Sequence, residues 1–85
     1  MKVLYFAWLR ERVGTGEEDV DPPAGVNTVA DLIDWLSARS PGHAHAFAQR
    51  DVIRAAVNQD FADPGDTVSP GDEVAFFPPV TGGCP

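Results

Sequence analysis

The closing run of the chain constrains its fold more than any other stretch. It consists of Phe76-Phe77-Pro78-Pro79-Val80-Thr81-Gly82-Gly83-Cys84-Pro85. A proline has no N–H to offer a neighbouring strand and fixes φ near about −65°, so a strand that reaches the two phenylalanines ends there and the proline pair directs the chain outward. The six residues from Pro78 to Gly83 span on the order of 20 Å when extended. Because the two glycines carry no side chain, such a tail can enter a narrow channel of a partner.

Length and charge narrow the classes of partner. Eighty-five residues predict one small domain that buries roughly 60–65% of its unfolded surface. The net charge of −7 repels phosphate backbones and anionic membrane surfaces, so we expect no nucleic acid and no membrane as partners, and a basic protein surface is favoured. One cysteine forms no internal disulfide, and the longest apolar run, Val3 to Leu9, is far below the roughly 20 residues that cross a bilayer. A cytoplasmic protein is expected.

The first third of the chain predicts two strands. Residues Lys2 to Leu9 are apolar on both alternating sides, which favours a strand buried on both faces. Gly14 and Gly16 indicate a hairpin turn, after which Glu17 to Asp21 returns as a short charged strand in an exposed sheet position.

The clearest helix begins after Thr28. A hydroxyl N-cap followed three residues later by Asp31 approximates a capping box. The helix then presents one apolar face, formed by Val29, Leu32, Ile33 and Leu36. The Ser40-Pro41-Gly42 run ends it, and His43 to Arg50 is compatible with a short second helix with Phe47 inward.

The last third predicts two further strands, Val52 to Asn58 and Glu73 to Phe77. A loop at Phe61 to Thr67 and a turn at Ser69 to Asp72 separate them. The whole pattern predicts an α+β domain over residues 1–77, with a mixed sheet of four to five strands and one main helix packed on one face. The sequence predicts an extended C-terminal tail over residues 78–85.

No catalytic or metal-binding set is evident. His43 and His45 lie two positions apart with no thiol or third histidine nearby, so we expect surface histidines and no metal site. The aspartates of the loops lack the spacing of a calcium loop, and no strained turn presents a nucleophilic serine or cysteine. Arg10, Phe61 and Phe77 are candidates for a docking surface beside the tail, although core packing is the common role of aromatic residues in small domains.

Four segments of the sequence resemble the MoaD family, the small sulfur-carrier subunits of molybdopterin synthase. They are Val3-Leu4-Tyr5-Phe6-Ala7, Leu9-Arg10-Glu11-Arg12-Val13-Gly14, Ala55-Ala56-Val57-Asn58-Gln59 and the run from Gly71 to Gly83. The resemblance implies a ubiquitin-like β-grasp fold whose first and last strands pair in parallel at the centre of the sheet. It also implies a heterotetramer of two small and two large subunits.

The resemblance further implies the chemistry of the tail. In that family a ubiquitin-activating-like adenylyltransferase uses ATP to adenylate the terminal glycine carboxylate, which becomes a thiocarboxylate. The sulfur is then given to the pyranopterin precursor in the active site of the large subunit. On this chain Gly83 would bear the sulfur and Gly82 would form the slender approach. Arg10, Phe61, Phe77 and the segment Pro78, Pro79, Val80, Thr81 would contact partners, with no cofactor bound to the chain itself.

One feature departs from the family, whose members end at the second glycine. Here Cys84 and Pro85 follow, so the Gly83 carbonyl lies in an amide. Three explanations compete: removal of the two residues by a processing protease, a copy that docks without carrying sulfur, and an acyl shift to the Cys84 thiol. Rival functions are a sulfur carrier for thiamine or tungsten-cofactor synthesis, a ubiquitin-like protein modifier, and an interaction domain that carries nothing.

Overall fold

The last strand of the chain lies at the centre of the fold. A computed structural model describes residues 1–79 and contains, in chain order, β1 (Lys2–Tyr5), α1 (Trp8–Val13), β2 (Glu17–Asp19), α2 (Val29–Ser37), α3 (Pro41–Ala46), the 3₁₀ helix η1 (Arg50–Val52), β3 (Arg54–Val57), β4 (Asp60–Ala62) and β5 (Glu73–Phe77). The strands form one sheet in the order β2-β1-β5-β3-β4. β1 and β5 are parallel, and the other neighbours are antiparallel.

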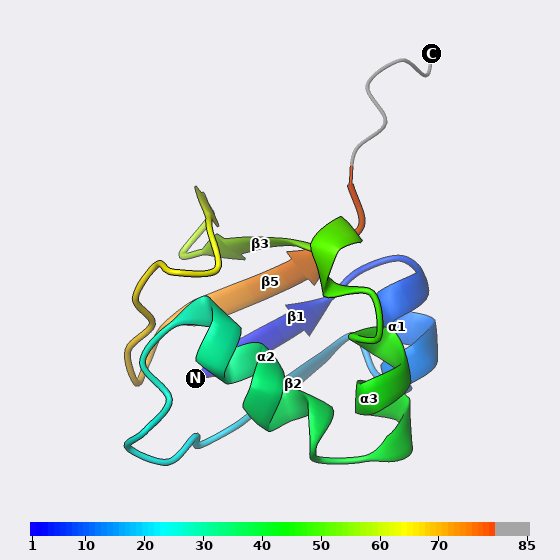
Figure 1. Cartoon of the computed structure of the whole chain (residues 1–85), viewed down its shortest axis with the longest axis horizontal. Helices are drawn as coiled ribbons and strands as arrows, with labels where there is room; N and C mark the ends of the chain where they lie inside the picture. Colours follow the sequence, from blue (N-terminus) through cyan, green and yellow to red (C-terminus); the bar gives the residue numbers. More distant parts are fainter. Residues whose placement is uncertain (80–85) are drawn as a thin grey trace.

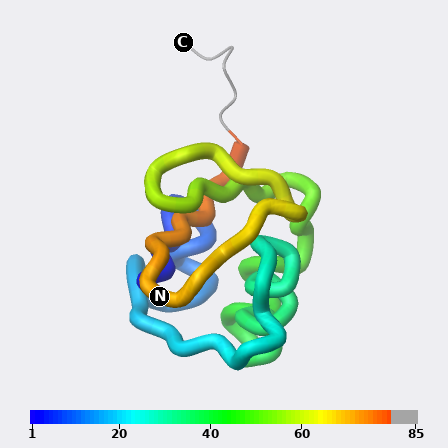
Figure 2. Tube along the Cα trace, turned by 90° about the vertical axis from the view of Figure 1, so that its left-hand side faces the viewer, coloured from blue at the N-terminus to red at the C-terminus, as the bar shows by residue number. Residues whose placement is uncertain are grey.

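The helices cover one face of this sheet only. Figure 1 shows α2 and α3 on the same side of the strands, and the view in Figure 2 separates the sheet from the helices. The prediction of an α+β domain with a mixed sheet, one main helix and a parallel central pair of first and last strands is therefore confirmed. None of the helices among residues 1–79 combines the length and the apolar character needed to cross a membrane.

The main helix begins as the sequence predicts. The Asp31 N–H donates to Thr28 Oγ1 at 3.1 Å, and the Thr28 N–H donates to Asp31 Oδ2 at 3.3 Å, which completes the capping box. The four apolar residues of α2 named above are buried, so the helical spacing fixed which face contacts the sheet.

Alternate residues of the two central strands fill the core. Val3, Tyr5, Val74 and Phe76 are at most 1% exposed. Phe47 joins them, with its ring centroid 5.0 Å from that of Phe76 in an edge-to-face arrangement. The predicted inward position of Phe47 is confirmed.

The N-terminal strand is shorter than predicted, and only one of its faces is buried. β1 ends at Tyr5, and Ala7, with φ of 55°, turns the chain into α1. The prediction for Lys2 to Leu9 was wrong because a short apolar run does not distinguish a strand from a helix. Phe6, predicted to be buried, is 49% exposed.

Three turn and loop predictions were also wrong in detail. Gly14, expected in a hairpin, adopts φ of 100° and ends α1, with its N–H donating to the Arg10 carbonyl. Ser40 and Pro41 start α3 instead of only ending α2. Phe61 lies in β4, where an antiparallel ladder to β3 overrides the loop-forming composition that follows it. β2 and β3 are shorter than their predicted ranges of Glu17 to Asp21 and Val52 to Asn58, and β5 matches its prediction.

Candidate docking surface and tail exit

The face of the sheet opposite the helices carries an apolar surface. Across four strands, Leu4 pairs with Ala75, Ala75 with Ala56 and Ala56 with Phe61, and residues paired in this way point to the same face. Phe6 and Phe77 extend the same face toward the end of β5. We call this surface the apolar sheet face; it consists of Leu4, Phe6, Ala56, Phe61, Ala75 and Phe77. The helices leave it uncovered (Figure 2).

Two of the predicted docking residues touch each other on this face. The ring centroids of Phe61 and Phe77 lie 5.9 Å apart with an interplanar angle of 58°. Phe61 is 82% exposed, whereas Phe77 is partly buried. A phenylalanine that leaves most of its area in water is poorly explained by core packing. The structure thus places Phe61 and Phe77 where a partner can reach them together.

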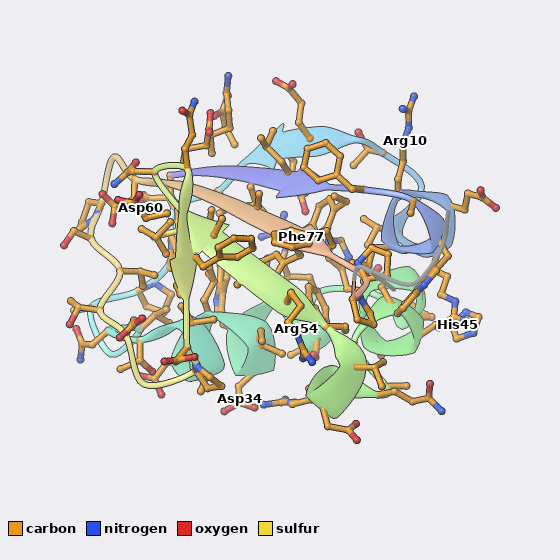
Figure 3. All side chains as sticks on the ribbon, turned by 90° about the horizontal axis from the view of Figure 1, so that it is seen from above. Arg10, Asp34, His45, Arg54, Asp60 and Phe77 are labelled. Carbon is orange, nitrogen blue, oxygen red and sulfur yellow. The ribbon has the colours of Figure 1, made fainter. Side chains whose placement is uncertain are left out.

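Arg10 lies on α1, beside the same face. It borders a shallow hollow together with Leu4, Phe6 and Gly16. A Cβ at Gly16 would lie 3.3 Å from Arg10 Nε, so the glycine leaves room for the arginine side chain to pass. Arg10 is exposed, and Figure 3 shows it on the opposite side of Phe77 from Arg54. The third predicted docking residue therefore flanks the apolar sheet face.

The tail leaves the domain at the end of β5. Pro78 is partly buried and Pro79 is exposed, and Figure 1 shows this segment leading away from the sheet. The predicted site residues Val80, Thr81, Gly82 and Gly83 lie outside the described residues, as do the two residues that follow them.

Sequence reasoning missed several residues of the docking surface. The strand patterns that contain Leu4, Phe6, Ala56 and Ala75 predict strands but no site. Arg54, which pairs with Phe77 across β3 and β5, carries no site signal in the sequence either. The alternation of side chains along each strand predicts which residues share a face of the sheet. It does not predict which of the two faces is left without a helix.

A partly buried polar cluster lies on the helix side of the sheet. Glu18 Oε2 accepts from Tyr5 OH at 2.6 Å and lies 2.8 Å from His43 Nε2. His43 Nδ1 in turn lies 2.7 Å from Ser40 Oγ. Arg39 approaches Glu18 Oε1 at 3.7 Å. The prediction of a surface histidine was wrong for His43, which is 8% exposed, because the ring is buried with polar partners on both nitrogens.

The contacts within the cluster shift the pKa values of Glu18 and Tyr5. Burial alone would raise the pKa of Glu18, but the hydrogen bonds from His43 and Tyr5 and the charges of His43 and Arg39 lower it below its ordinary value of 4.5. Burial raises the pKa of Tyr5, and the bond to the Glu18 carboxylate raises it further. Glu18 is therefore held as an anion between β2 and α3.

The contacts from Ser40 to His43 and from His43 to Glu18 have the residue types of a nucleophilic triad, but the serine is not available as a nucleophile. Ser40 Oγ also accepts the His43 N–H at 3.1 Å and is the N-cap of α3, so the hydroxyl is fixed in a helix start. Within residues 1–79, no three His, Cys, Asp or Glu side chains gather closely enough to hold a metal ion. The cluster joins the sheet to α3 and has a structural role.

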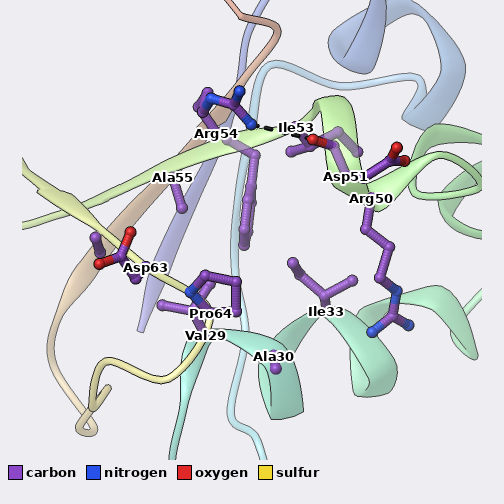
Figure 4. A pocket seen from close by; sticks show the side chains of 12 residues that line it. Val29, Ala30, Ile33, Arg50, Asp51, Ile53, Arg54, Ala55, Asp63 and Pro64 are labelled. Carbon is purple, nitrogen blue, oxygen red and sulfur yellow. Dashed lines mark hydrogen bonds between the residues drawn. The ribbon is translucent and has the colours of Figure 1, made fainter.

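A cavity of about 230 Å³ opens between α2 and the β3–β4 pair, and Figure 4 shows its lining. Val29, Ile33, Ile53 and Ala55 give it apolar walls, and Arg50 at its rim is paired with Asp34. Its volume is below the roughly 300–1,000 Å³ of ordinary ligand pockets. The apolar sheet face and the tail exit remain the candidate site.

The sequence and the structure of the chain are similar to those of known proteins. The chain is 45% identical to the molybdopterin synthase sulfur carrier subunit of Escherichia coli, over 98% of this chain and 99% of that protein. It is 35% identical to the human protein of the same name, over 98% and 93%. The crystal structure of small archaeal modifier protein 1 from Haloferax volcanii superposes with a TM-score of 0.73 at 34% identity, covering 94% of this chain and 97% of that one. The fold is thus the ubiquitin-like β-grasp. With residues 3–83 matching the family described as ThiS, the chain belongs to the ThiS family.

Proposed function

We propose that this chain is the sulfur-carrier subunit of a molybdopterin synthase and that Gly83 carries the sulfur. The observation that supports the proposal most is the central position of β5, which leads directly into Pro78 and Pro79 beside an uncovered apolar face. Relatives named molybdopterin synthase sulfur carrier subunit, 45% and 35% identical over almost the whole chain, support the same role.

Activation has to precede sulfur transfer because an ionised carboxylate, with a pKa near about 3.5, is a poor electrophile. In the proposed sequence a Gly83 carboxylate oxygen attacks the α-phosphorus of ATP on a ubiquitin-activating-like adenylyltransferase, which releases pyrophosphate and leaves an acyl-adenylate. A sulfide-level nucleophile then forms the C–S bond and expels AMP. The resulting thiocarboxylate donates its sulfur to the pyranopterin precursor. ATP is consumed by the partner, and the chain itself holds no cofactor.

The large subunit of the synthase is the proposed partner of the apolar sheet face. Phe61 and Phe77 would be buried against it together, with Arg10 at the edge of the contact. Pro78, Pro79, Val80 and Thr81 would lead the tail into its active site, and Gly82 would pass where no side chain fits. The acyl end then reacts on the order of 20 Å from the docking surface.

Removal of Cys84 and Pro85 is part of the proposal. With these residues attached, the Gly83 carbonyl lies in an amide and has no carboxylate to adenylate. A processing protease that cleaves after Gly83 would expose that carboxylate. A variant with Cys84→Ser should be processed and loaded like the original chain, whereas an acyl shift to the Cys84 thiol would make loading depend on that residue.

The test is the intact mass of two forms after incubation with the adenylyltransferase, ATP and sulfide. A form ending at Gly83 should exchange one oxygen for one sulfur, and the form that retains Cys84 and Pro85 should keep its mass. A third form that ends at Thr81 should still bind the large subunit without gaining sulfur. An unchanged mass of the Gly83 form, with an adenylyltransferase proven active on another carrier, would exclude the carrier role.

A second function is favoured by one observation, the similarity to small archaeal modifier protein 1 at 34% identity. A modifier would transfer the activated Gly83 acyl group to a lysine amine of another protein and form an isopeptide. The same incubation with cell protein, followed by proteolysis, separates the two functions. A modifier leaves tail residues on target lysines, and a sulfur carrier leaves only its own thiocarboxylate.

A further inference from the structure

The charged residues of the domain are unevenly distributed along the sheet. Thirteen acidic residues stand against six lysines and arginines. Acidic side chains gather at the beginning of β5, where Asp72 Oδ1 accepts from Asn58 Nδ2 at 3.1 Å and Glu73 follows directly. Arginines lie at the other end of the sheet, where β5 ends, and Figure 3 shows Asp60 far from both Arg10 and Arg54. The tail exit thus carries two exposed arginines, Arg10 and Arg54, with the acidic residues Glu11 and Asp51 near them in the sequence.

Most of the basic side chains have partners of their own. Lys2 pairs with Glu17, Arg39 with Glu18 and Arg50 with Asp34. Arg12 stacks on Trp8, with its guanidinium carbon 4.4 Å from the ring centroid. Within residues 1–79, Arg10 and Arg54 have neither an acidic partner nor an aromatic one. Both are exposed.

The two unpaired arginines stand on opposite sides of the strand that leads to the tail. Arg54 on β3 pairs in register with Phe77, and its Nη1 donates to the Asp51 carbonyl at 3.1 Å, which restrains the side chain without neutralising it. Arg10 on α1 flanks the face from the β1 side, next to Phe6. Phe77 lies between them (Figure 3).

We infer that Arg10 and Arg54 form an arginine pair that binds carboxylate side chains on the rim of the large subunit's cleft and so fixes the direction in which the tail enters it. The inference rests on the proposed function. Guanidinium groups suit this role because they stay charged and bind carboxylates through two parallel hydrogen bonds. A tail that enters the cleft fully extended would carry Gly83 on the order of 20 Å from Phe77, too far for the pair to act on the acyl group. The pair therefore affects binding to the large subunit and does not affect the rate of sulfur transfer.

Lys2, on β1 of the same sheet, provides the matched control. Lys2 pairs in register with Glu73, at the end of the sheet away from the tail, and its side chain is about half exposed. Changing Lys2 to Glu alters the net charge by the same amount as changing Arg10 or Arg54. A difference between these variants therefore reports where the charge lies and not how much charge the domain has.

The experiment measures binding of the Gly83-ended form to the large subunit of the same organism, at low salt and at about 0.5 M salt, where charges more than a few ångströms apart are screened. Arg54→Glu and Arg10→Glu should each weaken binding about tenfold at low salt, mostly through slower association, and the loss should shrink at high salt. Arg54→Lys should recover only part of the affinity, because an ammonium keeps the charge but does not make the two parallel hydrogen bonds. Lys2→Glu should change the affinity less than about twofold. In synthase turnover the charge reversals should raise the KM for the carrier and leave kcat unchanged.

Each outcome has a distinct meaning. Equal losses for Lys2→Glu and Arg54→Glu would overturn the arginine pair and leave the carrier role intact, as would unchanged binding of both arginine variants. A fall in kcat at saturating carrier would also overturn it, because the pair would then act on chemistry. Failure of the original Gly83-ended form to bind the large subunit would overturn the proposed function together with this inference. Melting temperatures within a few degrees of the original form identify the variants as folded.

Discussion

Truncation of Phe61 should separate docking from stability. Burying a whole phenylalanine side chain is worth about 2–3 kcal/mol. Phe61 is 82% exposed in the isolated domain, so most of that free energy is still available when a partner covers it. Phe61→Ala should therefore weaken binding to the large subunit by about 2 kcal/mol, or roughly 30-fold in Kd. The small area that Phe61 already buries limits the loss of folding stability to about 0.5 kcal/mol.

Isothermal titration of the Gly83-ended form into the large subunit measures the first quantity, and thermal denaturation measures the second. Trp35→Ala is the control, since it also removes an aromatic ring, in this case a partly buried one from α2, on the opposite side of the sheet. It should lower the melting temperature and leave Kd within about twofold.

Two results would refute the reasoning. If Phe61→Ala binds as tightly as the original form, the apolar sheet face is not the surface that the partner covers. If Phe61→Ala loses as much stability as a core truncation, about 3–5 kcal/mol, the side chain contributes to the fold and its exposure has been misjudged.

Other substitutions test how the domain is built. Glu18→Gln should destabilise the domain by about 1.5–3 kcal/mol at neutral pH. Because the folded-state pKa of Glu18 is lowered, this difference should be full above pH 4.5 and shrink as the pH falls below that value, as measured by denaturant unfolding over pH; a constant difference would contradict the account. Gly42→Ala places a Cβ 2.6 Å from the Arg12 carbonyl oxygen and should cost about 1–3 kcal/mol in the same assay, whereas a gain would show that α1 and α3 separate easily. Thr28→Ala removes the capping box and should lower the melting temperature by about 4–8 °C for a loss of about 1 kcal/mol, and no change would mean that packing alone starts α2.

Local sequence patterns correctly predicted those helices and strands whose start, end and buried face are determined by nearby residues. The capping box at Thr28 and the apolar spacing of α2 were sufficient for the main helix, and the Ser69 to Asp72 turn with the proline pair bounded β5. The parallel pairing of β1 with β5 joins residues about seventy positions apart, so it came only from the resemblance to a known family.

The errors have a common physical cause, since they depend on contacts that a single segment does not contain. Phe6 appeared buried because the sequence does not state which face of the sheet lacks a helix. His43 appeared exposed because its partner Glu18 lies twenty-five residues away. Arg54 was overlooked for the same reason, since its importance comes from its register with Phe77.

The mass of this protein isolated from its native cells tests the central claim most directly. The account predicts a chain that ends at Gly83, with a fraction in which one oxygen of that terminal carboxylate is replaced by sulfur. Finding only chains that retain Cys84 and Pro85, in cells that still make molybdopterin, would contradict it.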